Sequence, residues 1–182
     1  MKKIFATILM ATAALGFTAA SSAATKEAKA DYNAARDAAT AQYKEARAKC
    51  NSLNRNLKDV CIEEAKANQI RVKAEAEAKY KNTPKARTKA RQAIADAEFA
   101  LAKTRCGNLV DNARDVCIKE AKAAHIAAIA DAKADGKVTA ARSEARDEKR
   151  DADYKVELEK CEALAGAAKD ACVSGAKARF GR

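Results

Sequence analysis

A threefold repeat of cysteine pairs is the feature that most constrains how this chain can fold. Two cysteines separated by ten residues occur three times, and the first cysteines of successive pairs lie 56 and then 55 residues apart. An aromatic residue precedes each first cysteine by seven residues, and a leucine follows it by three. The pairs are Cys50/Cys61, Cys106/Cys117 and Cys161/Cys172. An even number of cysteines in matched surroundings indicates an internal duplication of one disulfide-containing unit.

The residues around the cysteines predict that each unit is a helical hairpin. Long runs of Ala, Lys, Glu and Arg flank every pair, and these are strong helix formers. Between the cysteines Asn and Gly interrupt the pattern. Asn56 and Asn112 each precede an aspartate by three residues, as helix N-caps do, whereas the third unit has Ala167 there. We therefore expect two antiparallel helices joined by a short turn, with the disulfide closing locally.

A different geometry is also compatible with the spacing. Residues eleven apart lie on one face of an uninterrupted helix, about three turns from each other. The two cysteines of a pair could not then meet, and the disulfides would run between different helices. The Asn and Gly interruptions favour the local hairpin.

Three hairpin units follow from the repeat, at residues 25–82, 83–136 and 137–182. Thr83 and Pro84 provide a cap and a first helical residue for the second unit, and Gly136 provides a stop before the third. The predicted helices cover residues 26–52, 57–81, 85–106, 112–134, 139–163 and 168–179. Glycine within a helix costs only about 1 kcal/mol, so Gly136 need not end a helix. The alternative to two separate helices is therefore one long bent helix over residues 112–163.

Composition limits how such helices can pack. From residue 25 onward, 41 of 158 residues are Ala and only 21 are Val, Ile, Leu or Phe. This content excludes a β-sandwich, a barrel or a Rossmann sheet, which need apolar strands. The expected fold is all-α, with three tandem disulfide-stapled antiparallel hairpins that are elongated or loosely packed. Whether the hairpins stack into a bundle or form a rod is left open.

The N-terminus predicts export. Lys2 and Lys3 precede the uncharged apolar run 4–17, and small residues follow, as in a secretory signal peptide. Cleavage is expected after Ala24, or after Ala23, so that 1–24 is the signal peptide. An uncleaved membrane anchor is the alternative, because residues 4–24 carry no charge. The mature chain is predicted to have no transmembrane segment and to be periplasmic or secreted, where its cysteines would be oxidised.

Motifs for catalysis are missing from this sequence. His125 is the only histidine, on an Ala-rich helix, and we interpret it as a surface or interface residue. There is no C-x-x-C, no glycine-rich phosphate loop and no G-x-S-x-G. Tyr43, Phe99 and Tyr154 share a helix face with the cysteines and should cover the inside of each hairpin; the alternative is that they grip a ligand. We expect no enzyme activity, cofactor or metal site.

Charge is the remaining indication of function. Residues 25–182 carry 34 basic and 25 acidic side chains, a net charge of +9. The strongest local excess, residues 78–95, contains six basic residues and no acid. We call these six the basic collar: Lys79, Lys81, Lys85, Arg87, Lys89 and Arg91. They are candidates for contact with anionic partners such as lipid head groups, lipopolysaccharide or acidic peptides. A solubilising surface is the alternative, and no specific nucleic-acid binding is expected.

Two resemblances concern location more than activity. Stretches such as 74–79 (AEAEAK) and 93–98 (AIADAE) resemble the long helical middle segment of the TolA envelope protein, which spans the periplasm. TolA keeps a membrane anchor and ends in a globular domain, whereas we expect this N-terminus to be cleaved and expect no globular domain after Cys172. The C-x10-C repeat is more similar to small secreted proteins of Gram-negative bacteria that are sometimes labelled TolA-like. The resemblance implies an envelope location, with no functional residue carried over.

The sequence therefore supports two functional hypotheses. The first is a non-catalytic periplasmic repeat protein that acts as a structural spacer, scaffold or envelope-maintenance factor, with envelope proteins as partners. The second is a cationic binding module or holdase for anionic envelope components or unfolded proteins, which would use the basic collar.

Overall fold

The computed structural model describes residues 20–182, which form five α-helices and two short 3₁₀ turns. Residues 1–19 of the predicted signal peptide lie outside the described part of the chain. The all-α fold of disulfide-stapled hairpins is confirmed, and most helix ends lie within a few residues of those predicted. The elements are α1 (Ala20–Lys49), η1 (Cys50–Ser52), α2 (Arg55–Lys81), α3 (Pro84–Arg105), η2 (Cys106–Asn108), α4 (Asp111–Glu162) and α5 (Gly166–Phe180).

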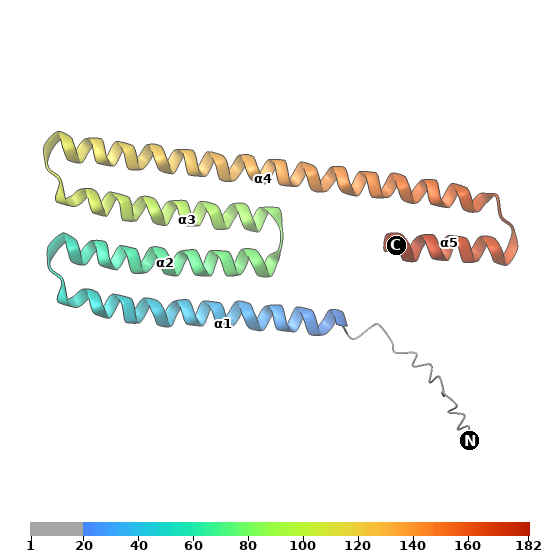
Figure 1. The fold of residues 1–182 in the computed structure, drawn as a ribbon, viewed down its shortest axis with the longest axis horizontal. Helices are drawn as coiled ribbons and strands as arrows, with labels where there is room; N and C mark the ends of the chain where they lie inside the picture. The colour runs from blue at the N-terminus through green and yellow to red at the C-terminus, as the bar shows by residue number, and fades with distance from the viewer. Residues whose placement is uncertain (1–19) are drawn as a thin grey trace, which may run out of the picture.

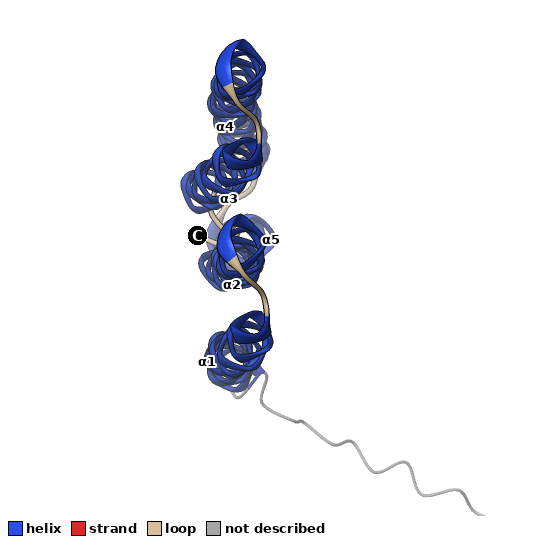
Figure 2. Ribbon diagram, turned by 90° about the vertical axis from the view of Figure 1, so that its left-hand side faces the viewer, coloured by secondary structure: helices blue, strands red, loops and turns tan. Residues whose placement is uncertain are grey.

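The helices lie side by side in a single layer (Figure 1). Each one packs mainly against its neighbours in the chain: α2 against α1, α3 against α2, α4 against α3, and α5 against α4. Seen along the helices, α1 to α4 form one column without a second layer behind it (Figure 2). α1 and α4 are the two edges of this sheet of helices. The hairpins therefore form neither a bundle nor a simple rod.

All three disulfides close locally. Cys50 joins Cys61, Cys106 joins Cys117 and Cys161 joins Cys172, with Cα–Cα distances of 5.7, 5.8 and 5.7 Å. These distances are within the usual range for a disulfide. The first cysteine of each pair is fully buried. The local-hairpin prediction is confirmed, and the alternative of an uninterrupted helix through each pair is wrong.

The three hairpin turns have the same backbone conformation. The N–H of the leucine three residues after the first cysteine donates to that cysteine's carbonyl, at 3.1 Å for Leu53, 3.0 Å for Leu109 and 3.1 Å for Leu164. The residue five positions after the first cysteine has a left-handed backbone, with φ of 51° at Arg55, 50° at Asp111 and 53° at Gly166. The duplication seen in the sequence thus extends to individual dihedral angles.

The predicted N-caps Asn56 and Asn112 are wrong. The cap positions are Asn54 in α2 and Val110 in α4, and neither makes a side-chain cap hydrogen bond. Asn56 lies in the first turn of α2 and packs against the second hairpin turn instead. A Cβ built on Gly107 would lie 2.9 Å from Asn56 Oδ1, so a larger residue at this position would require the Asn56 side chain to move. The third predicted cap, Ala167, also lies inside its helix, because α5 is capped at Ala165.

The predicted N-terminus of α3 is confirmed. Thr83 is the N-cap, and its hydroxyl accepts a hydrogen bond of 3.1 Å from the Ala86 N–H. Pro84 follows as the first helical residue, where its missing N–H costs nothing.

Gly136 does not end a helix, which corrects the predicted separate helices 112–134 and 139–163. α4 runs unbroken for 52 residues, as in the alternative stated above. A Cβ at position 136 would collide with the hydroxyl of Thr88 on α3. Glycine is therefore used for the close approach of α3 and α4, and its flanking helix formers carry the helix through. The second and third hairpins share α4.

Alanine makes most of the contact between helices. Among the described residues, the buried apolar ones are ten alanines and three cysteines. Small side chains allow close approach but bury little area each, so packing alone contributes little. None of the described helices is long and apolar enough to cross a membrane.

Candidate functional site

Aromatic pairs close the hairpins away from the disulfides. The ring of Phe99 on α3 stacks on His125 of α4, with 4.9 Å between centroids. Tyr154 and Phe180 pair across α4 and α5 at 5.6 Å. Both pairs join the residue seven before a first cysteine to the residue eight after the second. At the open end of the first hairpin, Tyr32 stacks on Tyr80 at 5.0 Å. The predicted structural role of Phe99 and Tyr154 accounts for their positions.

His125 is an interface residue between α3 and α4. Its Nε2 lies 2.6 Å from Oδ1 of Asp96, and its side chain is 23% exposed. The imidazole ring stacks on Phe99, and its edge contacts Asp96. These two contacts account for His125 as a residue that joins α3 to α4. Within residues 20–182, no cluster of three histidine, cysteine or acidic side chains is arranged to hold a metal ion.

The basic collar surrounds the turn between α2 and α3, and half of it is already engaged. Lys81 forms an ion pair with Glu77 at 2.5 Å, and Arg91 forms one with Asp135 of α4. Arg87 donates to Oδ1 of Asn82 at 3.0 Å. The other three members are Lys79, Lys85 and Lys89, which make no ion pair with another described residue. Neutralisation within the fold thus lowers the charge available to an anionic ligand.

The collar is divided between the two sides of the layer. Lys79, Arg87 and Arg91 line a groove of about 580 Å³ over the α2–α3 contact, together with Ile94. Lys89 lines a smaller groove on the other side of the same contact, next to Glu77. The collar therefore does not act as one cluster, and the arginine side offers the stronger cationic surface.

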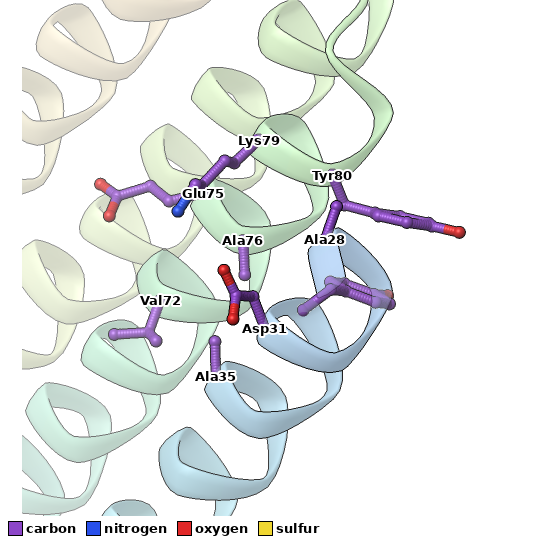
Figure 3. Close-up of a pocket in the computed structure, with 9 residues that line it drawn as sticks. Ala28, Asp31, Ala35, Val72, Glu75, Ala76, Lys79 and Tyr80 are labelled. Atoms are coloured by element: carbon purple, nitrogen blue, oxygen red, sulfur yellow. The ribbon is translucent and has the colours of Figure 1, made fainter. Parts of the chain in front are cut away.

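A second groove lies between α1 and α2 at the open end of the first hairpin, with a volume of about 350 Å³. Figure 3 shows Asp31 and Ala35 of α1 opposite Val72 and Ala76 of α2. Lys79 lines this groove as well as the one over α2 and α3. The groove between α1 and α2 is lined mostly by apolar atoms. No pair of its lining residues has the arrangement of a nucleophile and its base.

Three side chains in two surface ion pairs have a shifted pKa: Glu77, Lys81 and Glu157. A hydrogen bond from Lys81 lowers the pKa of Glu77, and the same bond raises the pKa of Lys81. Lys160 likewise lowers the pKa of Glu157 through a hydrogen bond. The largest cause of each pKa shift is a hydrogen bond to a partner on the same helix, and charges on neighbouring helices contribute less.

Sequence reasoning missed the ion pairs that join different helices. Arg71 of α2 binds Glu98 of α3 at 2.6 Å, and Glu64 binds Arg105 at 2.7 Å. In an antiparallel pair, residues that face each other have numbers with a constant sum, here 169. A search of the sequence for oppositely charged residues whose numbers add up to one such constant would have found both ion pairs.

Comparison with protein-family models, curated proteins and solved structures finds no significant match to this chain.

Proposed function

We propose that the protein is a non-catalytic structural spacer or scaffold of the bacterial periplasm. The observation that carries the proposal is α4, a continuous helix of 52 residues, or about 78 Å, along one edge of a single-layered sheet. Residues 20–182 form broad faces and long edges with open grooves between neighbouring helices. Such a shape suits the holding of partners at fixed separations along an envelope.

A bare stretch of α4 supports the spacer role. Residues 143–150 lie between the part of α4 that packs on α3 and the part that packs on α5 (Figure 1). All of them except Ser143 are exposed, and six are charged. A helix that is polar all round is typical of a bridge through solvent between two packed units. We define residues 143–150 as the bridge segment.

The disulfides and the predicted signal peptide support the location. A thin layer packed through alanine gains little from apolar burial, and each disulfide contributes roughly 3 kcal/mol by closing a short loop. Such bonds persist in an oxidising compartment. The compositional resemblance to the periplasmic segment of TolA supports the same location.

Changing the length of the bridge tests the spacer role. We would insert a second copy of residues 140–150 after Arg150, which adds eleven residues, about three turns or 16 Å, and keeps the helix face nearly in register. In a strain lacking the native gene, the spacer proposal expects loss of envelope integrity that the native gene restores and the lengthened variant does not. The readouts are detergent sensitivity and leakage of a periplasmic reporter.

Circular dichroism and periplasmic fractionation of the lengthened protein provide the control, because both should match the native chain. Full complementation by the lengthened variant would contradict the spacer role. A deletion strain with an intact envelope would contradict the role in envelope maintenance.

A second candidate function is the binding of an anionic amphiphile. The groove of about 580 Å³ is lined by three cations, one carboxylate and apolar side chains, which include Lys79, Arg87, Arg91, Glu75, Ala78 and Ile94. Arg91 is paired with Asp135, so Lys79 and Arg87 provide most of the positive charge. That combination matches an anionic head group with an attached acyl chain, as in envelope lipids. Its cationic rim would attract vesicles in a salt-dependent way.

Vesicle flotation tests this candidate. The native chain should float with vesicles containing anionic lipid and not with zwitterionic vesicles, and salt should release it. Lys79→Gln with Arg87→Gln and Arg91→Gln should reduce binding severalfold, whereas the matched change of Lys26, Lys29 and Lys44 to Gln on α1 should have less effect. Equal loss in the two triple variants would show a response to net charge alone and exclude a site.

A further inference from the structure

α2 and the first half of α4 are equivalent helices, but only α2 is covered on both sides. Each is the second helix of its unit, and their residues correspond by a shift of 56. Ala67 and Ala78 of α2 are buried at 8% and 9% exposure. Their counterparts Ala123 and Ala134 are exposed on α4. We define the outer face of α4 as Val116, Glu120, Ala123, Ile126, Ala130 and Ala134.

The outer face of α4 is apolar as well as uncovered. Val116 is 44% exposed and Ile126 is 58% exposed. Their counterparts on α2, Val60 and Ile70, are partly buried. The six residues of the outer face are the same as their α2 counterparts, and only the covering helix is absent. This face therefore repeats the apolar part of a surface that packs against a helix within the same molecule, whereas Arg71 of α2 is replaced by Ala127.

The helix that covers α2 shows what fits this face. α3 is the first helix of the second unit, and it docks through buried Ala86, Ala90 and Ala97. Glu64 of α2 binds Arg105 at the cysteine end of this contact. Farther along, Glu77 and Ala93 line one groove. The docking surface is therefore a row of alanines flanked by two ion pairs, Glu64 with Arg105 at the cysteine end and Arg71 with Glu98 farther along.

α1 is the counterpart of α3 in the first unit, and it presents the same row without a cover. Ala30, Ala34 and Ala41 correspond to Ala86, Ala90 and Ala97, and all three are exposed on the edge of the sheet. Its inner side, in contrast, packs on α2 through buried Ala39. One face of α1 therefore packs against α2, and the opposite face is exposed.

We propose that a second copy of this chain docks the outer side of its α1 onto the outer face of α4. Charge complementarity favours this occupant. Lys49 replaces Arg105, so it would meet Glu120, the counterpart of Glu64. At the other end Asp37 replaces Ala93 and Lys133 replaces Glu77. The alanine and the glutamate that line one groove between α2 and α3 are thus replaced by an aspartate and a lysine, which have opposite charges.

This contact joins the two opposite edges of the sheet, so it is head-to-tail. Each added copy leaves a new α4 edge free, and the assembly grows as a continued single layer (Figure 1). The bare edges are accessible because α5 folds back on the same side of α4 as α3. The inference follows from the repeat alone and does not depend on the proposed function.

Sedimentation velocity of the full chain over a range of concentrations is the test. The proposal expects the weight-average sedimentation coefficient to rise with concentration past that of a dimer. Val116→Glu with Ile126→Glu should abolish the rise, because it places charges in the contact. Val156→Glu with Leu164→Glu, at exposed positions outside the face, is the matched control and should leave the rise unchanged. Circular dichroism should show equal helix content in both variants.

A charge exchange identifies the partner surface. Glu120→Lys or Lys49→Glu alone should weaken association severalfold, and the two together should restore it. Asn51→Gly should strengthen association, because position 51 corresponds to Gly107 and a Cβ there crowds the asparagine opposite.

Four outcomes would overturn the proposal. A monomer at every concentration excludes self-docking, and association that survives Val116→Glu with Ile126→Glu places the contact elsewhere. A limiting dimer insensitive to Lys49→Glu indicates that α4 pairs with α4. Association that the exchanged pair does not restore excludes the contact between Glu120 and Lys49.

Discussion

At the scale of single residues, the three hairpin turns differ in how well their amino acids suit a shared backbone. The left-handed φ is 51° at Arg55 and 50° at Asp111, but 53° at Gly166. A left-handed conformation costs an ordinary residue about 1 kcal/mol, and glycine adopts it freely. The first two turns are therefore strained, and the disulfides and flanking helices hold them in place.

This strain predicts opposite effects of two substitutions. Gly166→Ala should destabilise the third hairpin by about 1 kcal/mol, because alanine must adopt the left-handed φ. Arg55→Gly should stabilise the first hairpin by less than that, since glycine also gains freedom in the unfolded chain. Thermal unfolding followed by circular dichroism measures both, with Gly175→Ala in the middle of α5 as the control that should be stabilising. A stable Gly166→Ala variant would contradict the strain.

The ion pair between Glu77 and Lys81 predicts a local pH dependence. Because the pKa of Glu77 is lowered in the folded state, the pair stabilises α2 above the unfolded pKa of Glu77. That contribution disappears as the pH falls through the lowered folded pKa. The pKa of Lys81 is raised, so its contribution is complete below its unfolded pKa and disappears as the pH rises through the folded value.

An NMR titration of the Glu77 carboxyl carbon should show this shift directly. Its midpoint should lie below the ordinary value for glutamate, and Lys81→Gln should raise it. The fold as a whole should not respond, since an exposed ion pair is screened by solvent and contributes little to the stability of the fold. An unchanged midpoint in Lys81→Gln would show that the hydrogen bond is absent in solution.

At the scale of elements, the third hairpin depends most on its disulfide. α5 has only 15 residues and packs mainly against α4, whereas α3 is held by α2 on one side and α4 on the other. A helix of that length is marginal by itself in water. Its other attachments are the contact of Phe180 with Tyr154 and ion pairs at the surface, such as Lys169 with Glu162.

Removing single disulfides should therefore have graded effects. Cys161→Ser with Cys172→Ser should release α5, so that its amide hydrogens exchange much faster than those of α2 and α3. Cys106→Ser with Cys117→Ser should have the smallest effect on exchange, because α3 keeps its contact with α2. Hydrogen exchange followed by mass spectrometry distinguishes the two, and reduction of all three bonds should lower the melting temperature. Equal protection of α5 with and without its disulfide would contradict the grading.

At the scale of the whole molecule, the single layer determines an extended shape. A compact domain of 182 residues has a radius of gyration of about 16 Å. α4 alone, at 52 residues, is about 78 Å long. Small-angle X-ray scattering at low concentration should give a maximum dimension of at least about 78 Å and a radius of gyration well above that of a compact domain. A compact profile would show that the hairpins fold onto one another in solution.

Features that depend on short spacings along the chain could be predicted from the amino-acid pattern. Helix-forming flanks, a ten-residue gap and Asn or Gly between the cysteines were sufficient to predict the hairpins, the pairing of Cys50 with Cys61 and its counterparts, and the start of α3 at Thr83. The reason is that a disulfide and a helix cap each involve residues within about a dozen positions, where backbone geometry leaves few alternatives.

Tertiary structure alone decided what depends on contact between helices. Gly136 was predicted to stop a helix, and only the presence of Thr88 across the interface shows that it serves close packing inside α4. Asn56 was predicted to be a cap, and the neighbouring turn at Gly107 places it in a contact instead. Among the basic collar, the engagement of Arg91 follows from Asp135, 44 residues away. An alanine-rich surface contains few large side chains that distinguish one helix neighbour from another, so the single layer could not be derived from the sequence pattern.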